Sequence, residues 1–293
     1  MKTKVYQSKL LLFGEYLVLV KGKALARPLN HFNGQWVYLD DPEENNPYYH
    51  AFLSLSTYFR KNSCSDFLNL DALDADIRGG LHFESNIKTG YGTGSSGALV
   101  AAIYDLYAKE EEKNRGLESV REQLILMESF FHGKSSGVDP LVSYTDKTVL
   151  LGPEGSIDLL DIKEEGISCF LIDSGKSRST EPLVKVFKEK MNNQEYLNRI
   201  INPLKLHSDK AIDAYLKGHQ TEVVRRVAEI SALQYEGFQE MILPEFQVLW
   251  QQSLKQDQFS LKLCGAGGGG FYLAFGDEED IRSKFSAFDI IKV

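Results

Sequence analysis

Residues 88–98 form a glycine- and serine-rich stretch, Lys-Thr-Gly-Tyr-Gly-Thr-Gly-Ser-Ser-Gly-Ala, which joins an expected strand to an expected helix. The extended pattern of residues 81–84 precedes it, and the apolar helical pattern of residues 98–109 follows it. Glycine lets the backbone approach a ligand closely, and the first turn of a helix presents unpaired N–H groups and a partial positive charge. The stretch therefore predicts a phosphate-binding loop, with a tight turn that binds no ligand as the alternative.

Two other phosphate motifs fit this loop poorly. A Walker A loop has a lysine after its last glycine, and no lysine follows the glycines here. The order Gly92-Thr-Gly94-Ser-Ser-Gly97 matches the dinucleotide fingerprint in form. The acidic residues that follow, 110–112, lie at the end of a helix instead of on a second strand. We therefore do not expect a dinucleotide site.

Composition narrows the classes of partner. The chain has 293 residues, of which 43% are hydrophobic and 25% charged, enough for one large domain or two of moderate size. Its net charge is −8 and it has no Lys/Arg-rich run, so nucleic acid is not an expected partner. An acidic chain that binds phosphate must concentrate positive potential locally, which favours a small ligand together with a metal ion.

The cysteines and the apolar runs predict a cytoplasmic protein. Cys64, Cys169 and Cys264 are far apart and odd in number, which favours a reducing compartment over a disulfide framework. The first residues lead into an expected strand and do not resemble a signal peptide. No apolar run reaches the roughly 18 residues that a membrane span needs, so no membrane partner is expected.

A β-rich first half and an α+β second half predict two domains. In the first half, periodicity and turn residues predict strands at 5–13, 16–20, 24–26, 35–39 and 81–84, a loop at 40–46, and helices at 48–60, 98–109 and 116–131. A loop at 132–140, a hairpin of 147–151 and 157–160 and a strand at 168–173 follow. The remainder is predicted to be a helical region at about 181–255, interrupted at Pro203 and Pro244, and strands at 261–263, 271–275 and 288–293.

Four separated stretches resemble the GHMP kinases, the superfamily of galactokinase, homoserine kinase, mevalonate kinase and phosphomevalonate kinase. Residues 8–19 are similar to the family's N-terminal Gly-Lys-x-x-x-x-Gly-Glu-His/Tyr segment, and residues 88–98 to its Gly-Leu-Gly-Ser-Ser-Ala signature. Residues 128–139 resemble the catalytic segment of mevalonate kinases, and residues 262–270 the C-terminal glycine motif. One glycine motif would be a weak signal, whereas four in the correct order are specific.

The resemblance implies an α+β fold with two domains. Residues 1–163 would form an N-terminal ATP-binding domain like domain 2 of ribosomal protein S5, and residues 164–293 a ferredoxin-like C-terminal domain. It also implies phosphoryl transfer from ATP, which needs a phosphate cradle, a cation and an oriented hydroxyl group. The residues that would bind the nucleotide are Gly90, Gly92, Gly94, Ser95, Ser96 and Gly97.

The resemblance also assigns metal and catalytic roles. Ser96 and Glu128 would bind Mg²⁺, an ion that prefers oxygen ligands. Asp139 matches the catalytic aspartate, which would accept or polarise the proton of the acceptor hydroxyl. Lys9 matches the lysine beside that aspartate, which would keep Asp139 ionised and stabilise charge on the transferring group.

Each of these residues also has a structural alternative. Lys9 would be an edge or surface lysine of a strand, and Asp139 a turn former before a proline. Glu128 would be a solvated carboxylate at a helix end, and Ser96 an N-cap. His132 is interpreted as a structural loop histidine and not as a base.

The acceptor is expected to be a small, anionic molecule. The resemblance places it near Glu15, Tyr16, Thr180, Gly265, Ala266 and Gly267. Lys176 and Arg178 are further candidates for binding an anion, with solvated loop residues as the alternative.

Departures from the family pattern leave the acceptor open. Lys88 and Thr89 stand where mevalonate kinases usually have prolines, Thr93 replaces leucine and Gly97 replaces alanine. Tyr16 stands where mevalonate kinases have a histidine that helps bind the acceptor. The sequences Gly-Glu-Tyr at 14–16, Lys-Thr-Gly at 88–90 and Gly-Ser-Ser-Gly at 94–97 are closer to phosphomevalonate kinases, whereas residues 128–139 are closer to mevalonate kinase.

The leading hypothesis is an ATP- and Mg²⁺-dependent kinase of mevalonate-kinase type, with phosphomevalonate kinase as the alternative. The related decarboxylase is disfavoured because the motifs follow the kinase forms. A catalytically silent GHMP-fold sensor is the alternative of another class. The retention of all four catalytic and metal-binding candidates argues against it. A homodimer is compatible with the resemblance.

Overall fold

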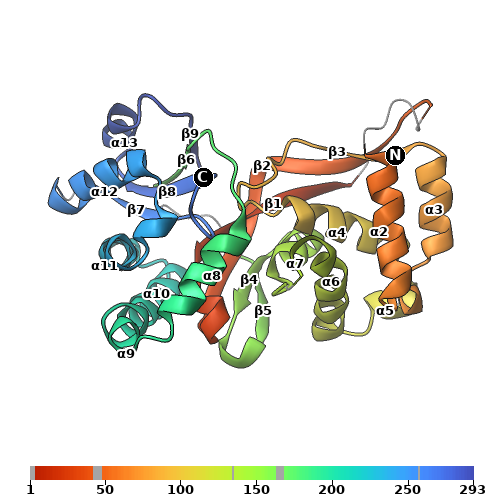
Figure 1. Ribbon diagram of the computed structural model, residues 1–293, viewed down its shortest axis with the longest axis horizontal. Coiled ribbons are helices and arrows are strands. Elements are labelled where there is room, and N and C mark those ends of the chain that lie inside the picture. The colour runs from red at the N-terminus through yellow and green to blue at the C-terminus, as the bar shows by residue number, and fades with distance from the viewer. Residues whose placement is uncertain (1–3, 42–47, 134, 163–167, 257) are drawn as a thin grey trace. The chain divides into compact units, whose positions relative to one another are not determined.

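A computed structural model describes residues 4–41, 48–133, 135–162, 168–256 and 258–293 (Figure 1). The chain forms two compact units that interleave along the sequence. The first unit comprises Met1–Lys9, Ala26–Lys88 and Gly94–Val149, and the second comprises Leu10–Leu25, Thr89–Thr93 and Leu150–Val293. The expected domain boundary at residues 163 and 164 lies outside the described residues, and the division into 1–163 and 164–293 stays a prediction.

The strands are β1 (Val5–Phe13), β2 (Ala24–Tyr38), β3 (Leu81–Ser85), β4 (Thr148–Leu151), β5 (Ile157–Leu160), β6 (Cys169–Asp173), β7 (Phe259–Leu263), β8 (Phe271–Gly276) and β9 (Ile290–Lys292). The α-helices are α2 (Tyr49–Lys61), α3 (Leu70–Arg78), α4 (Ser95–Tyr107), α5 (Glu110–Lys113), α6 (Leu117–His132), α7 (Val138–Thr145), α8 (Thr180–Lys190), α9 (Gln194–Tyr196), α10 (Asn202–Leu216), α11 (Gln220–Gly237), α12 (Pro244–Gln256) and α13 (Glu278–Lys284). Short 3₁₀ turns are η1 (Leu17–Val20), η2 (Cys64–Asp66), η3 (Pro153–Gly155) and η5 (Gln239–Met241), and η4 (Leu197–Ile201) is a π-helix.

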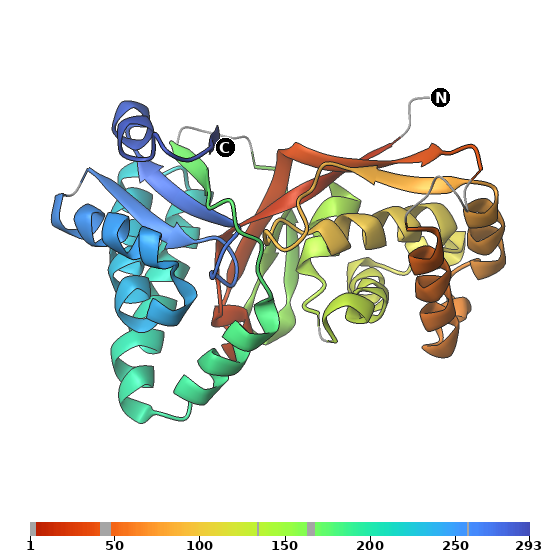
Figure 2. The same ribbon diagram turned by 45° about the horizontal axis from the view of Figure 1, so that its top comes forward.

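The first unit is built around α4, which is apolar on nearly every side. Val100, Ala101 and Ile103 are all fully buried, as expected for a helix with apolar residues all round. Helices α4, α6 and α7 lie along one side of strands β2 and β3 (Figures 1 and 2). The first sheet has the order β1-β2-β4-β5, and β3 pairs antiparallel with β2. This packing places the first turns of α4 and α7 beside β1.

The second unit contains an antiparallel sheet of order β7-β8-β6-β9. All five residues of β6 are buried, which explains the continuous apolar run in its sequence. Helices α11 and α12 pack on β7, and α10 packs along α11 (Figure 2). The core residue Trp250 donates its indole N–H to Ser231 Oγ at 2.8 Å, so its polar atom is satisfied.

Several expected elements are confirmed and three are corrected. The strand at 5–13 and the hairpin of β4 and β5 are confirmed. The expected strand at 16–20 is wrong, because Tyr16 and Lys21 have left-handed backbones and enclose the 3₁₀ turn η1. The expected strands at 24–26 and 35–39 are one strand, β2, in whose middle Asn30 and His31 are exposed. The loop expected at 132–140 ends early, because α7 begins at Val138.

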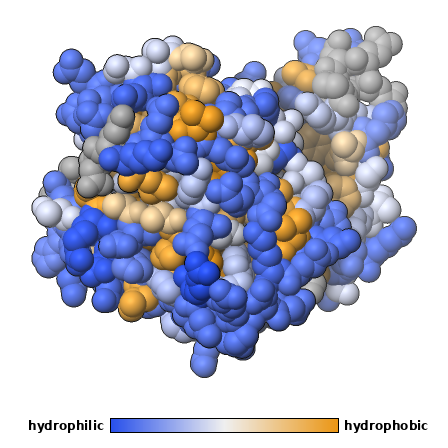
Figure 3. All heavy atoms as spheres, turned by 60° about the vertical axis from the view of Figure 1, so that its left-hand side comes forward, coloured by the Kyte–Doolittle hydropathy of each residue, from blue (hydrophilic) through white to orange (hydrophobic). Residues whose placement is uncertain are grey.

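Most of the loop expected at 40–46 lies outside the described residues, as does Lys134 of the 128–139 segment. Within the described ranges, no helix combines the length and hydropathy of a membrane span. The three cysteines are buried, and none of them forms a disulfide bond. On the face drawn in Figure 3, hydrophobic residues are scattered in small groups among hydrophilic ones.

Candidate functional site

The first unit brings Lys9 of β1 together with Asp139 of α7. Lys9 Nζ lies 3.0 Å from Asp139 Oδ2, and the two side chains are 6% and 31% exposed. Ser143 of α7 donates to the Gln7 carbonyl of β1 at 2.7 Å, which holds the helix against the strand. Lys9 is therefore a buried, paired cation and not a surface lysine, although its strand β1 lies at the edge of the sheet.

The second half of the glycine loop lies directly against this ion pair. Gly94 has a φ of 80° and precedes α4, whose first helical hydrogen bond runs from Ala98 N–H to the Gly94 carbonyl. A Cβ atom at Gly94 would lie 2.9 Å from Lys9 Cγ, and one at Gly97 would lie 2.8 Å from the carbonyl carbon of Asp139. The N–H groups of residues 95–97 precede the first helical bond, as in an anion-binding helix terminus.

Glu128, near the end of α6, completes the group. Its side chain accepts a hydrogen bond from Ser96 Oγ at 3.3 Å through one oxygen and a second from Ser135 Oγ through the other. Burial and the negative charge of Asp139 raise the pKa of Glu128 to about 7, against the opposing effects of Ser135, Lys9 and Ser96. Ser135 lies in the segment 128–139 that resembles the catalytic stretch of mevalonate kinases, but the sequence does not predict a role for it. A hydroxyl between a helix end and a glycine was its only signal.

The donor set suits a hard cation better than a softer metal. In the part of the chain that the structure describes, no three His, Cys, Asp or Glu side chains gather into a metal-binding group. Ser96 and Glu128 instead offer hydroxyl and carboxylate oxygen atoms, and Asp139 is close enough to affect the Glu128 pKa. Oxygen donors with few protein ligands are what Mg²⁺ uses when it is also bound to phosphate.

The first half of the glycine loop, residues 89–93, belongs to the second unit. The Gly90 carbonyl accepts a hydrogen bond from Arg178 N–H at 3.3 Å, and a Cβ atom at Gly92 would lie 2.2 Å from Arg178 Nη2. Thr93 is 1% exposed, and its Oγ1 has no hydrogen-bond partner among the described residues. Thr93 stands where the family pattern has leucine, and it lowers the stability of the fold because a buried hydroxyl without a partner is unfavourable.

Arg178 also holds the C-terminal glycine loop. Its Nη1 donates to the carbonyls of Gly267 at 2.8 Å and Gly269 at 3.2 Å, and its Nη2 donates to Cys264 at 3.3 Å. A Cβ atom at Gly265 would lie 2.7 Å from the same Nη2. Burial lowers the pKa of the guanidinium. Arg178 is thus engaged with backbone carbonyls and is not a solvated loop residue.

Tyr16 and Glu15 lie in the same unit as the C-terminal loop. The Tyr16 hydroxyl donates to the Ala266 carbonyl at 2.6 Å. The Tyr16 ring packs against the Phe187 ring, with 4.8 Å between the two ring centroids. Glu15 forms a buried ion pair with Lys262 at the end of β7. The sequence does not predict this pair, although a lysine in a largely apolar strand before a glycine run is a usable signal of a buried charge.

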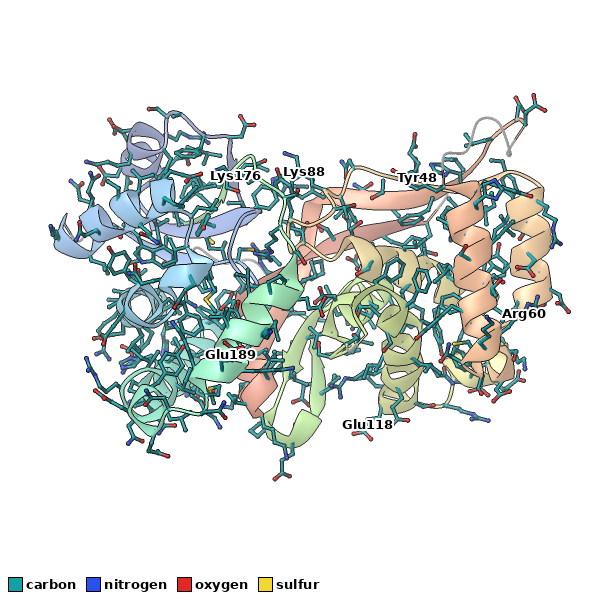
Figure 4. The ribbon with its side chains drawn as sticks, in the orientation of Figure 1. Tyr48, Arg60, Lys88, Glu118, Lys176 and Glu189 are labelled. Carbon is teal, nitrogen blue, oxygen red and sulfur yellow. The ribbon has the colours of Figure 1, made fainter. Side chains whose placement is uncertain are left out.

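Two acceptor candidates are exposed. Thr180 is the first residue of α8. Lys176, labelled in Figure 4, forms an ion pair with Glu245 at 2.6 Å. The side chain of His132 lies outside the described set. Of the acceptor-side predictions, the structure therefore groups residues 15, 16 and 265–267 and leaves Thr180 at the surface.

Known proteins resemble this chain both in sequence and in structure. Residues 59–147 match the sequence profile of the family described as GHMP kinases N terminal domain. The structure superposes on mevalonate kinase from L. major in complex with R-mevalonate with a TM-score of 0.66 at 18% identity, covering 98% of this chain and 90% of that one. The protein has the GHMP kinase fold. The predicted α+β GHMP kinase architecture is confirmed.

Two further proteins are similar to this chain, one in structure and one in sequence. A phosphomevalonate kinase from Streptococcus pneumoniae superposes with a TM-score of 0.66 at 18% identity, covering 100% of this chain and 99% of that one. In sequence, mevalonate kinase from Archaeoglobus fulgidus is 24% identical over 208 residues, which is 70% of this chain and 68% of the relative. Both acceptor classes raised by the sequence therefore occur among the proteins that this GHMP kinase fold resembles.

Proposed function

We propose that the protein is an ATP- and Mg²⁺-dependent small-molecule kinase, with mevalonate as the leading acceptor. The observation that carries the proposal is the Lys9–Asp139 ion pair seated against Gly94 and Gly97 of the phosphate loop. A kinase of this kind needs little covalent chemistry from the protein. It needs a bound phosphate chain, neutralised charge and a hydroxyl group held in position.

The residues of the first unit divide these tasks. The N–H groups at the start of α4 would bind the phosphates of ATP, and Ser96 and Glu128 would hold Mg²⁺, which neutralises charge on those phosphates when bound. Asp139 would accept the proton of the acceptor hydroxyl. Lys9, 3.0 Å away, would keep that carboxylate ionised and stabilise negative charge that develops on the transferring group.

The second unit would serve the acceptor. Glycines 265 and 267 have φ values of 81° and 72°, so their backbone can present N–H groups to an anion in a way that most residues cannot. Tyr16 and Arg178 fix this loop through its carbonyls. Phosphomevalonate is the second candidate acceptor, because Lys88, Thr89 and Tyr16 depart from the mevalonate kinase pattern towards it.

The test is ADP release with a panel of acceptors that includes mevalonate, phosphomevalonate, galactose and homoserine. We expect turnover with mevalonate above all others, and a drop of about 100- to 10,000-fold for Asp139→Asn with ATP affinity retained. Intact ATP binding without turnover of any acceptor would favour the silent sensor. Selective turnover of phosphomevalonate would keep the kinase and change its acceptor.

A further inference from the structure

The two glycines that flank the serines of the phosphate loop each contact one member of the Lys9–Asp139 pair. The position that a Cβ would take at Gly94 is 2.9 Å from Lys9 Cγ. At Gly97 it is 2.8 Å from the carbonyl carbon of Asp139 and 2.9 Å from the Pro140 nitrogen. Real Cβ atoms do not approach backbone atoms this closely, so α4 and α7 can meet here only because residue 97 lacks a side chain.

The backbone conformation at residue 97 does not require a glycine. It lies within α4, and its φ is outside the left-handed range that favours glycine. The methyl group of an alanine would point at the backbone of α7 and not towards the side where the free N–H groups of α4 would bind phosphate.

We propose that Gly97 is a positioning residue that sets the distance of the Asp139 carboxylate from the phosphate loop. The absence of a side chain at residue 97 is what allows α7 to lie this close to α4. The proposal rests on the kinase function proposed above. An alanine would push the first turn of α7 away from α4 by a few tenths of an ångström or more, because the two nearest atoms, the Asp139 carbonyl carbon and the Pro140 nitrogen, belong to the backbone and cannot rotate aside.

The test compares Gly97→Ala with Gly79→Ala. A Cβ atom at Gly79 would lie 3.4 Å from its nearest neighbour, an ordinary contact, so this control adds the same methyl group without a clash. We expect kcat to fall about 10- to 100-fold in Gly97→Ala, with ATP affinity matching the control and a thermal midpoint below that of the control, because the displaced helices pack less well. A kcat within threefold of wild type, or a protein that no longer unfolds cooperatively, would overturn the proposal.

A second measurement separates positioning from a general loss of activity. Asp139→Glu lengthens the carboxylate side chain by one methylene group. If Gly97→Ala moves α7 away from the loop, the longer side chain regains part of the lost reach. The kcat loss caused by Asp139→Glu should then be smaller in the Gly97→Ala background than in wild type. Equal losses in both backgrounds would count against the proposal. Absence of turnover in wild type itself would instead refute the kinase function.

Discussion

The ammonium of Lys262 and the carboxylate of Glu15 form an ion pair in the interior of the second unit, where their side chains are 0% and 2% exposed. The two residues are 247 positions apart in the sequence. Lys262 also donates to the Leu263 carbonyl at 2.9 Å. The pair joins the segment after β1 to the strand that leads into the C-terminal glycine loop, and the adjacent Tyr16 hydroxyl makes a second connection, to Ala266.

Removing one charge from this pair should be costly. Glu15→Gln or Lys262→Met leaves the other charge buried without its partner, and we expect the free energy of unfolding in urea to fall by about 3–5 kcal/mol. The double variant Glu15→Leu/Lys262→Met should recover much of that loss, since no charge remains to be desolvated. The control is Lys292→Met, which breaks the exposed pair with Glu278 and should change stability by less than about 1 kcal/mol. Single variants as stable as this control would refute the argument.

A substitution at Thr93 should raise the stability of the protein instead of lowering it. Its hydroxyl is buried and has no partner among the described residues, so Thr93→Val removes a desolvation penalty while keeping the shape of the side chain. We expect the free energy of unfolding to rise by about 1–2 kcal/mol, measured in urea without nucleotide. Thr145→Val is the control, because the Thr145 hydroxyl donates to Leu141 at 2.8 Å and its removal should not stabilise the protein. Destabilisation by Thr93→Val would show that its hydroxyl is satisfied.

Local patterns were sufficient for much of this fold. The run Leu10–Leu12 predicts a buried strand, and β1 has the expected bounds. Tyr16–Val20 is equally rich in β-formers but forms a 3₁₀ turn, because the Gly22 N–H bonds to the Leu17 carbonyl and closes the chain on itself. Propensity reports how a residue fits a sheet and not whether a partner strand is available.

In the candidate site, too, the sequence predicts the residues of local motifs but not the contacts between distant segments. Glycine, serine and acidic residues at motif spacing identify Ser96, Glu128 and Asp139 from sequence. The contact of Gly97 with Asp139 and the pairing of Glu15 with Lys262 join residues far apart in the chain. Spacing along one strand or helix cannot report such contacts, since they depend on how separate elements pack.

The raised pKa of Glu128 makes stability depend on pH. With a pKa of about 7 in the folded protein and 4.5 as the ordinary value, the folded state binds more protons than the unfolded state between these limits. The free energy of unfolding should therefore fall as pH rises from about 4.5 to 7 and level off above it, by on the order of 3 kcal/mol. Glu128→Gln should remove this decline and be the more stable protein at pH 8. Urea titrations with EDTA at several pH values measure the difference, and parallel curves for the two proteins would contradict it.

Ser96 tests the metal assignment separately from catalysis. If its hydroxyl and the Glu128 carboxylate hold Mg²⁺ together, Ser96→Ala removes one ligand and leaves the helix start and Asp139 in place. We expect the Mg²⁺ concentration for half-maximal ADP release to rise at least about tenfold, because even groups behind the direct ligands change metal affinity by that factor. Ser129→Ala is the matched control, since the Ser129 hydroxyl donates to Ile125 within α6 at 2.8 Å. Excess Mg²⁺ should restore turnover in Ser96→Ala but not in Asp139→Asn, because only the first defect lies in metal affinity. An unchanged Mg²⁺ requirement in Ser96→Ala would remove this serine from the metal site and leave Glu128 to bind the ion with water and phosphate.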